Sequence, residues 1–198
     1  ELASKIEIFN LNEPVGKQDQ YIASYGGIKV FKFNKDGKVN ISNNILNKSL
    51  VEVLEKKLLL FFTGFSRKSN AILNEQNEKT NKNNNMMIKN LDFIKDLGIK
   101  SLSAIKKGNF DEFCKIMNEH WTFKKKRSKR MSNTFINSCY EYALNNGAKA
   151  GKVVGAGGGG FLMFYSDNKK KLIKALKKKK ISEVDFKFDH EGTKVMVR

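Results

Sequence analysis

The sequence contains little of what marks secreted, membrane-spanning or linker-rich chains. Its only cysteines, Cys114 and Cys139, show neither a metal-binding spacing nor a disulfide framework, which favours a reducing cytoplasm. No run of 18 apolar residues occurs, so no membrane-spanning helix is expected. Residues 1–5 do not combine a basic head with an apolar core, so no signal peptide is expected. A single proline, Pro14, excludes a proline-rich linker.

Acidic residues are scarce relative to basic ones. The 198 residues include 38 Lys and Arg against 20 Asp and Glu, a formal net charge of +18. Such a balance is typical of proteins that bind nucleic acid, anionic lipid or an anionic small molecule. A composition rich in both Lys and Asn explains it equally well. The apolar fraction of 40%, with 15 Phe, is too high for a disordered chain, so a folded core is expected.

Two segments hold most of the positive charge. Residues 121–130 carry six cationic side chains, and residues 167–180 carry eight Lys and one Asp. Each segment is predicted to lie on a helix whose other side is apolar. A nucleic-acid surface would interleave aromatic residues with the basic ones, and only Phe123 is placed in that way. We therefore favour solvated helix faces, with a basic nucleic-acid-binding module as an alternative.

The first half of the chain has strand and helix patterns in turn. Residues 25–33 alternate in polarity, Asp36-Gly37 is typical of a hairpin turn, and residues 39–41 begin the returning strand. The apolar run 58–62 predicts a buried strand. The polar stretch 67–85 is predicted to be a helix that frays at its end.

The second half begins with helices. Residues 87–105 have a helical apolar period, which Gly98 is predicted to interrupt. Asn109 is expected to cap the next helix, with acidic residues in its first turn and basic residues at its end. A further helix is predicted to start at Ser132 or Asn133 and to stop at Gly147.

Strand patterns return after this helix. They cover residues 152–154, 161–165, 184–188 and 194–198, and a Lys-rich helix lies between the second and the third. Helices and strands with an open sheet predict an α+β fold. Residues 1–55 are interpreted as the end of one domain and residues 56–198 as a second domain.

A run of small residues, 155–160, separates two of these strands. Gly155, Gly157 and Gly160 satisfy the G-x-G-x-x-G pattern of dinucleotide-binding loops, but that motif opens a helix, whereas residues 161–165 are predicted to form a strand. A Walker-type phosphate loop is also excluded, because no Lys-Ser or Lys-Thr follows the last glycine. Consecutive residues with no more than a methyl side chain expose backbone N–H groups that bind anions. The alternative is a flexible hairpin connection, although this needs only one or two glycines.

A second unusual stretch is Gly16-Lys-Gln-Asp-Gln-Tyr21. The carboxylate of Asp19 stands among side chains that offer many hydrogen-bond partners, and a nearby Lys would keep it ionised. An ionised carboxylate can orient a hydroxyl and accept its proton. The alternative is that Asp19 caps a helix.

Taken together, the two stretches resemble the GHMP kinase family of small-molecule kinases. Residues 16–21 with Tyr25-Gly-Gly27 resemble the segment that carries the catalytic Asp of its sugar-1-kinases, and residues 152–161 resemble the C-terminal glycine motif. Both motifs, in this order and at this distance, are strongly specific. The resemblance runs nearly end to end and implies a GHMP kinase-like fold: the end of an N-terminal domain, residues 1–55, and then a C-terminal α/β sandwich of the ferredoxin-like type, residues 56–198.

The resemblance also implies a reaction. It is the ATP-dependent phosphorylation of the anomeric hydroxyl of a sugar phosphate of the heptose 7-phosphate type, for the synthesis of surface polysaccharide precursors. Asp19 matches the catalytic Asp, and the loop of Gly155, Ala156, Gly157, Gly158, Gly159 and Gly160 would line the site near the transferring phosphate. Lys17, Gln18 and Arg67 are weaker candidates for contacts to the sugar phosphate.

One departure from the family pattern bears on this interpretation. The nucleotide-phosphate loop of the family and its Mg²⁺ ligands are absent, so the chain is expected to be a C-terminal portion whose ATP and Mg²⁺ contacts lie upstream. A non-catalytic fragment, or a subunit that needs a separate N-terminal piece, is the second hypothesis. No metal cluster is predicted; His120 is interpreted as a core or cleft histidine and His190 as part of a turn.

Overall fold

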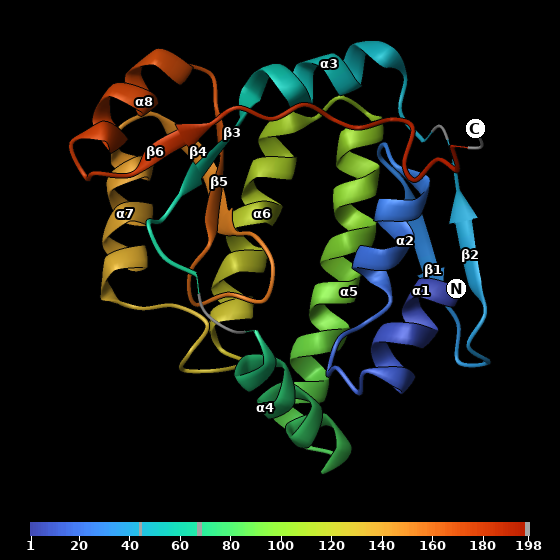
Figure 1. Ribbon diagram of the computed structural model, residues 1–198. Coiled ribbons are helices and arrows are strands. Elements are labelled where there is room, and N and C mark those ends of the chain that lie inside the picture. Colours follow the sequence, from blue (N-terminus) through green and yellow to red (C-terminus); the bar gives the residue numbers. More distant parts are fainter. Residues whose placement is uncertain (44, 67–68, 197–198) are drawn as a thin grey trace. The chain divides into compact units, whose positions relative to one another are not determined.

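The computed structural model describes residues 1–43, 45–66 and 69–196 of the chain (Figure 1). Two compact units are present. The first comprises Glu1–Glu55 and Lys187–Arg198, and the second comprises Lys56–Phe186. The sequence places the residues from Lys187 onward with the second unit, whereas the structure groups them with the first.

The first unit combines short helices with a hairpin. The hairpin is antiparallel, with Phe31 opposite Ile41, and Gly37 in its turn has a φ of +83°, so the predicted hairpin is confirmed. A last helix leads from this unit into the second. The elements are α1 (Leu2–Lys5), the π-helix η1 (Ile6–Asn10), α2 (Gln18–Tyr25), β1 (Val30–Phe33), β2 (Val39–Ser42) and α3 (Lys48–Lys57).

An aromatic cluster packs α2 against the hairpin. The ring of Tyr21 lies edge-on to the rings of Phe31 and Phe33, with centroids 5.9 and 6.0 Å away, and the ring of Tyr25 lies 6.3 Å from that of Phe31. Edge-to-face pairs at these distances are favourable beyond the apolar area that they bury. The cluster therefore holds α2, the helix that carries Asp19, in place on the hairpin.

The end of the chain does not form the two strands that the sequence predicts. A short strand, β6 (Ser182–Val184), precedes it, and no strand occurs in the described residues 185–196. Val195 and Met196 are each 87% exposed, so alternation along this segment buries no apolar face. Without such a face the period-two pattern has no stabilising contacts, which explains why the described residues 185–196 form no strand. Residues 197 and 198 of the second predicted strand lie outside the described residues.

This segment instead attaches to the end of α2 through its backbone. The N–H of Gly27 donates to the carbonyl of Asp189, and the N–H of Thr193 donates to that of Ser24 over 3.3 Å. The two chains approach closely at Gly26 and Gly192: a Cβ on Gly192 would lie 2.4 Å from the Ser24 carbonyl oxygen. Glycine at both positions is therefore what permits this contact.

The second unit is built on a four-stranded antiparallel sheet. The order of its strands is β4-β5-β3-β6, with β3 at Leu58–Phe62, β4 at Ala148–Val153 and β5 at Phe161–Ser166. With helices after the first and third strands along the chain, this is the strand–helix–strand–strand–helix–strand order of the ferredoxin-like motif. The predicted α+β class and the ferredoxin-like sandwich are confirmed.

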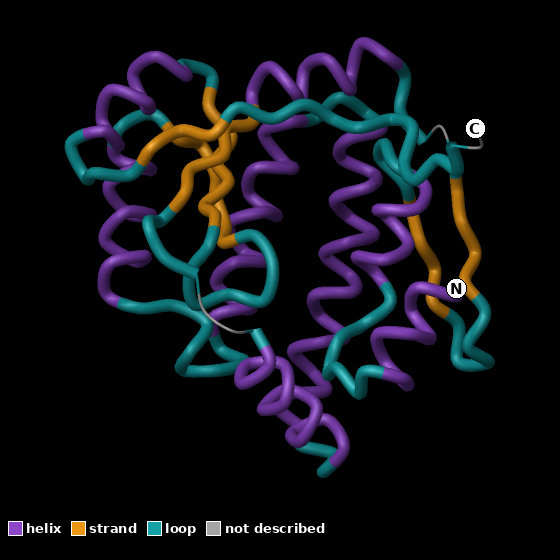
Figure 2. The backbone as a smooth tube through the Cα atoms, in the orientation of Figure 1, coloured by secondary structure: helices purple, strands orange, loops and turns teal. Residues whose placement is uncertain are grey.

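Helices lie on both sides of this sheet. In Figures 1 and 2, α7 and α8 lie on one side of the strands, and α6 with α5 lies on the other. The predicted caps are confirmed, because the side chains of Asn109 and Asn133 accept hydrogen bonds from the N–H groups of Glu112 and Ile136. The helices are α4 (Asn70–Asn81), α5 (Asn85–Lys106), α6 (Phe110–Lys125), α7 (Thr134–Asn145) and α8 (Lys169–Lys177).

Gly98 does not interrupt α5. The helix continues through it from Asn85 to Lys106, contrary to the prediction. A glycine in a helix interior costs only about 1 kcal/mol relative to alanine. The helix buries Met87, Leu97 and Ala104, and this packing outweighs the local cost.

The core of the second unit joins the sheet to helices on both of its sides. Trp121 of α6, Ile136 of α7 and Leu172 of α8 are completely buried, as is Phe164 of β5. Gly151 of β4 lies directly beneath the Phe164 ring, where a Cβ would be 2.3 Å from a ring carbon. The approach of β4 to this ring thus requires glycine.

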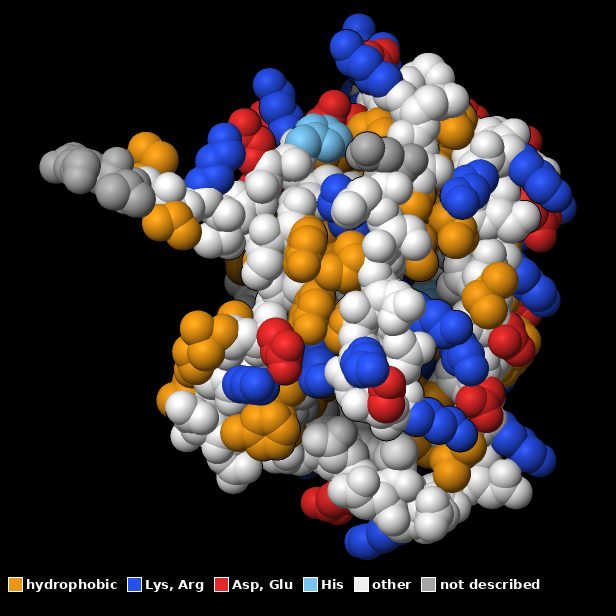
Figure 3. Space-filling model, turned by 90° about the vertical axis from the view of Figure 1, so that its right-hand side faces the viewer, with side chains coloured by type: hydrophobic (Ala, Val, Ile, Leu, Met, Phe, Trp, Pro, Cys, Tyr) orange, Lys and Arg blue, Asp and Glu red, His pale blue; other side chains and the backbone are white. Residues whose placement is uncertain are grey.

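The surface of the first unit exposes apolar side chains among basic ones. Leu2, Phe9 and Leu11 are largely exposed, and Figure 3 shows hydrophobic side chains at several places on this side of the molecule. None of the helices among the described residues is both long and apolar enough to span a membrane.

Two glycine substitutions test the packing of the second unit. Gly151→Ala is expected to lower the free energy of unfolding by about 1–3 kcal/mol, because the new methyl overlaps the Phe164 ring. Gly98→Ala, whose methyl meets no atom within 4 Å, is expected to raise it by about 0.5–1 kcal/mol. Urea denaturation measures both. A Gly151→Ala chain as stable as the wild type would contradict the close contact of β4 with Phe164.

Candidate functional site

The glycine loop, residues 155–160, connects β4 to β5. A strand follows it, as predicted, and no helix begins there, so it lacks the helix N-terminus of a dinucleotide-binding loop. Gly155, Gly157, Gly158 and Gly160 all have φ between +78° and +105°, a region that side chains with a Cβ rarely adopt. The backbone conformation of the loop therefore requires glycine at four positions, which is more than a simple two-residue turn would need.

Backbone hydrogen bonds fix the shape of the loop. The N–H groups of Gly158 and Gly160 donate to the carbonyls of Met131 and Phe65, each over 2.8 Å. Close packing adds to this, because a Cβ on Gly157 would lie 2.4 Å from the Met131 sulfur. The loop is therefore held against two other segments rather than projecting freely.

The remaining amides of the loop differ from these two. The N–H groups of Gly155, Ala156, Gly157 and Gly159 donate to no acceptor among the residues that the structure describes. At the mouth of the loop, the Lys124 ammonium donates to the Gly155 carbonyl. Unpaired amides in successive loop residues, with a cation beside them, form a site suited to an anion.

Asp19 lies in the first turn of α2, and its side chain is exposed. It does not cap the helix, because Lys17 occupies the N-cap position and no side chain there bonds to the backbone, so the capping alternative is wrong. Its carboxylate makes no hydrogen bond or ion pair with any residue in the described parts of the chain. The carboxylate is thus available to an external group, at a helix end that favours negative charge.

The other predicted contact residues differ in their surroundings. Gln18 is exposed beside Asp19, and the Lys17 ammonium donates to the Gly37 carbonyl over 3.2 Å rather than to Asp19. Arg67 lies outside the described residues. The structure thus joins Lys17, Gln18 and Asp19 at one helix start within the first unit, and the glycine loop belongs to the second.

A small cavity of about 290 Å³ lies between α5, α6, β5 and β4, the strand that precedes the glycine loop. His120 and Lys152 line it, and the Nδ1 atom of His120 is buried without a partner among the described residues. Burial, and then the positive charges of Lys152, Lys124 and Arg127, lower the pKa of His120 to about 3. Burial likewise lowers the pKa of Lys152. His120 is therefore a neutral cleft histidine, consistent with its interpretation from the sequence.

Sequence reasoning missed the contacts of two cationic side chains at and after the end of α6. Lys124 was grouped with a solvated helix face, yet it bonds to the loop itself. Arg127 also faces inward, because its Nε donates to the Asn90 side chain over 2.9 Å. Their place at the C-terminal end of α6 could be predicted from the sequence, but only the tertiary structure shows which of these side chains contact other parts of the unit.

Within the described ranges, no three His, Cys, Asp or Glu side chains gather in a way that could hold a metal ion.

The fold and the loop define the class of this protein. Residues 101–182 match the family model "GHMP kinases C terminal", so this part of the chain is a GHMP kinase C-terminal domain. The whole chain has the corresponding fold: it aligns with a galactokinase from Lactococcus lactis solved with galactose, at a TM-score of 0.72 and 17% identity, over 96% of this chain and 59% of that one.

Two relatives are more similar in sequence. The D-glycero-alpha-D-manno-heptose 7-phosphate kinase of Campylobacter jejuni is 34% identical over 98% of this chain and 57% of its own length. The solved D-glycero-D-manno-heptose 1-phosphate kinase of Bacteroides thetaiotaomicron is 28% identical, with a TM-score of 0.71 over 99% of this chain and 54% of its own. The chain thus spans little more than half the length of each of these two relatives.

The buried state of His120 can be tested by titration. Its folded pKa lies below the usual 6.5, so this group favours the folded state above pH 6.5, and that contribution is lost as the pH falls toward 3. In NMR spectra we expect the His120 ring signals to show no titration between pH 8 and about 5. The His190→Gln variant, which leaves one histidine, assigns the signal. A midpoint near 6.5 for His120 would show that the cleft is solvated.

Proposed function

We propose that the protein carrying this chain is a kinase that transfers the terminal phosphoryl group of ATP to a sugar phosphate. The substrate class is a heptose phosphate, and the acceptor is the anomeric hydroxyl of a 7-phosphate. The single observation that carries the proposal is the glycine loop, whose four unpartnered amides lie in a GHMP kinase C-terminal domain. The similarity to two heptose phosphate kinases supports the sugar class. The product would enter the synthesis of surface polysaccharide precursors.

The loop would act on the phosphate. Phosphoryl transfer proceeds through a loose transition state whose charge spreads over the phosphoryl oxygens, so catalysis depends on positioning and charge stabilisation. Backbone amides fixed in advance stabilise such charge without reorganising during the reaction. The bonds from Gly158 and Gly160 to Met131 and Phe65 supply that rigidity, and the free amides of Gly155, Ala156, Gly157 and Gly159 supply the donors.

Asp19 would act on the hydroxyl. Its carboxylate is exposed, has no partner among the described residues and lies at a helix start, so it can accept a hydrogen bond or a proton from the attacking hydroxyl. Lys17 and Gln18 flank it and would contact the sugar, although Lys17 would first have to leave the Gly37 carbonyl. Arg67 is proposed as a further contact to the sugar phosphate, in the same role as in the sequence-based prediction.

ATP and Mg²⁺ are part of the proposal as co-substrate and counter-ion. Mg²⁺ would arrive bound to the ATP phosphates, where its chemistry is to neutralise their negative charge. The described residues of this chain gather no ligand set of their own for it. Their proposed part is therefore limited to holding the phosphate at the loop and the hydroxyl at Asp19.

The role of Asp19 is tested by Asp19→Asn in the purified enzyme. Loss of the carboxylate is expected to lower kcat about 10²–10⁴-fold with little change in the KM for ATP, because a proton acceptor acts in the chemical step. Asp36→Asn, which makes the same change in the exposed hairpin turn of the same unit, is the matched control and should keep its turnover. A coupled assay of ADP release measures kcat, and ³¹P NMR identifies the phosphorylated position. Near-wild-type turnover of Asp19→Asn would rule Asp19 out as the catalytic group.

A further inference from the structure

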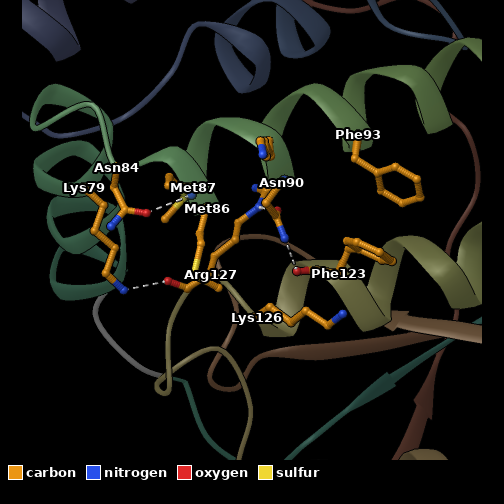
Figure 4. Close-up of a pocket in the computed structure, with 10 residues that line it drawn as sticks. Lys79, Asn84, Met86, Met87, Asn90, Phe93, Phe123, Lys126 and Arg127 are labelled. Carbon is orange, nitrogen blue, oxygen red and sulfur yellow. Dashed lines mark hydrogen bonds between the residues drawn. The ribbon is translucent and has the colours of Figure 1, made fainter.

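A second cavity lies within the helical part of the second unit, and none of the residues that line it belongs to the glycine loop. It has a volume of about 510 Å³. Figure 4 shows its walls: the first turns of α5 on one side, the C-terminal end of α6 and the residues after it on the other, and Lys79 of α4 at its edge. All of these elements belong to the second unit.

The charged side chains that line this cavity are all cations: Lys79, Lys89, Lys126 and Arg127. Lys79 is paired with Glu75 over 2.6 Å. The other three have no carboxylate partner among the residues that the structure describes. Three uncompensated positive charges around one hollow create a local potential that attracts an anion.

Arg127 is the most constrained of these cations. Its Nε donates to the Asn90 side chain over 2.9 Å, and its Nη1 lies 3.5 Å from the Gln76 side-chain oxygen. Both partners are neutral amides, which orient the guanidinium without neutralising it. Burial lowers the pKa of Arg127, which shows that the charge is held at a cost in solvation. A guanidinium held in this way is pre-organised for bidentate contact with phosphate oxygens.

The rest of the lining is apolar and partly aromatic. The rings of Phe93 and Phe123 lie 4.1 Å apart, and the Lys126 ammonium lies 4.2 Å from the Phe123 centroid. Met87 is buried beside them at the start of α5. Asn90 joins the two parts of the cavity, since its side chain also donates to the Phe123 carbonyl over 2.8 Å. An apolar wall beside oriented polar groups is typical of small-molecule pockets.

From this arrangement we propose that the cavity binds a phosphate monoester of a ring-bearing small molecule, with its phosphate at Arg127, Lys126 and Lys89 and its ring against Phe93, Phe123 and Met87. The ring can be that of a sugar phosphate or of a nucleotide, which share this chemistry. The inference does not depend on the proposed kinase function, because none of these residues belongs to the glycine loop or to the Asp19 segment.

The experiment is an NMR titration of the ¹⁵N-labelled protein with four probes: inorganic phosphate, glucose 6-phosphate, AMP and adenosine. The site is read from the amide and side-chain signals of Asn90, Phe93 and Phe123, so binding elsewhere is distinguished. Loss of one charged phosphate contact is expected to weaken binding about ten-fold or more. Arg127→Gln and the exposed Lys126→Gln are the two test variants. Arg130→Gln and Lys125→Gln, whose residues do not line the cavity, are the matched controls.

We expect glucose 6-phosphate, AMP or both to shift these signals more strongly than inorganic phosphate, and adenosine to have little effect. Saturation by the sugar phosphate alone or by AMP alone identifies the source of the ring. Lys126→Gln keeps the test decisive if Arg127→Gln fails to fold. The proposal is overturned if adenosine binds as well as AMP, if the shifts fall outside the cavity, or if both test variants bind like their controls.

Discussion

The fixed backbone of the glycine loop is the constraint on which the rest of this account depends. Two of its amides are bonded to Met131 and Phe65, which come from other parts of the second unit, and four others have no acceptor among the described residues. Glycine at position 157 allows the loop to touch Met131, and glycine at 151 allows the preceding strand to lie under the Phe164 ring. Close packing and exposed donors thus arise from the same lack of side chains. The fold positions the loop, and the proposed role of its free amides is to bind the transferring phosphate.

Local signals explain most of what the sequence predicted correctly. Asn109 and Asn133 cap helices because their side chains reach an N–H three residues away, and the strand at residues 58–62 is apolar because it lies inside the sheet. The wrong predictions concern segments whose structure is set by contacts with residues far away in the sequence. Gly98 sits in a helix that packing stabilises, and the last residues bind to the end of α2 through Gly192 rather than extending the sheet. Neither the continuous helix at Gly98 nor the contact at Gly192 can be predicted from the pattern of apolar residues in a ten-residue window.

The same limit applies to the candidate site. The loop and Asp19 could be singled out as candidates because unusual residues stand in a short stretch, but the roles proposed for them rest on resemblance and on relatives. The basic residues were harder to interpret. The cluster at the end of α6 looked like one solvated face, yet Lys124 bonds to the loop, Arg127 turns toward Asn90 and Lys126 covers a phenylalanine ring. Most of the remaining charge stays on exposed lysines such as those of α8. Charge count alone therefore says little about which anions this protein binds.

The central claim is that the unpartnered amides of the glycine loop bind phosphate. Backbone ¹⁵N–¹H spectra recorded while ATP is added test it most directly, with a parallel titration using a heptose phosphate. The account predicts that the N–H signals of Gly155, Ala156, Gly157 and Gly159 shift downfield on binding, because they gain an acceptor. The signals of Gly158 and Gly160, whose N–H groups are already bonded, should move much less. Equal shifts for all six residues, or no shift at ligand concentrations that saturate the enzyme, would contradict the claim.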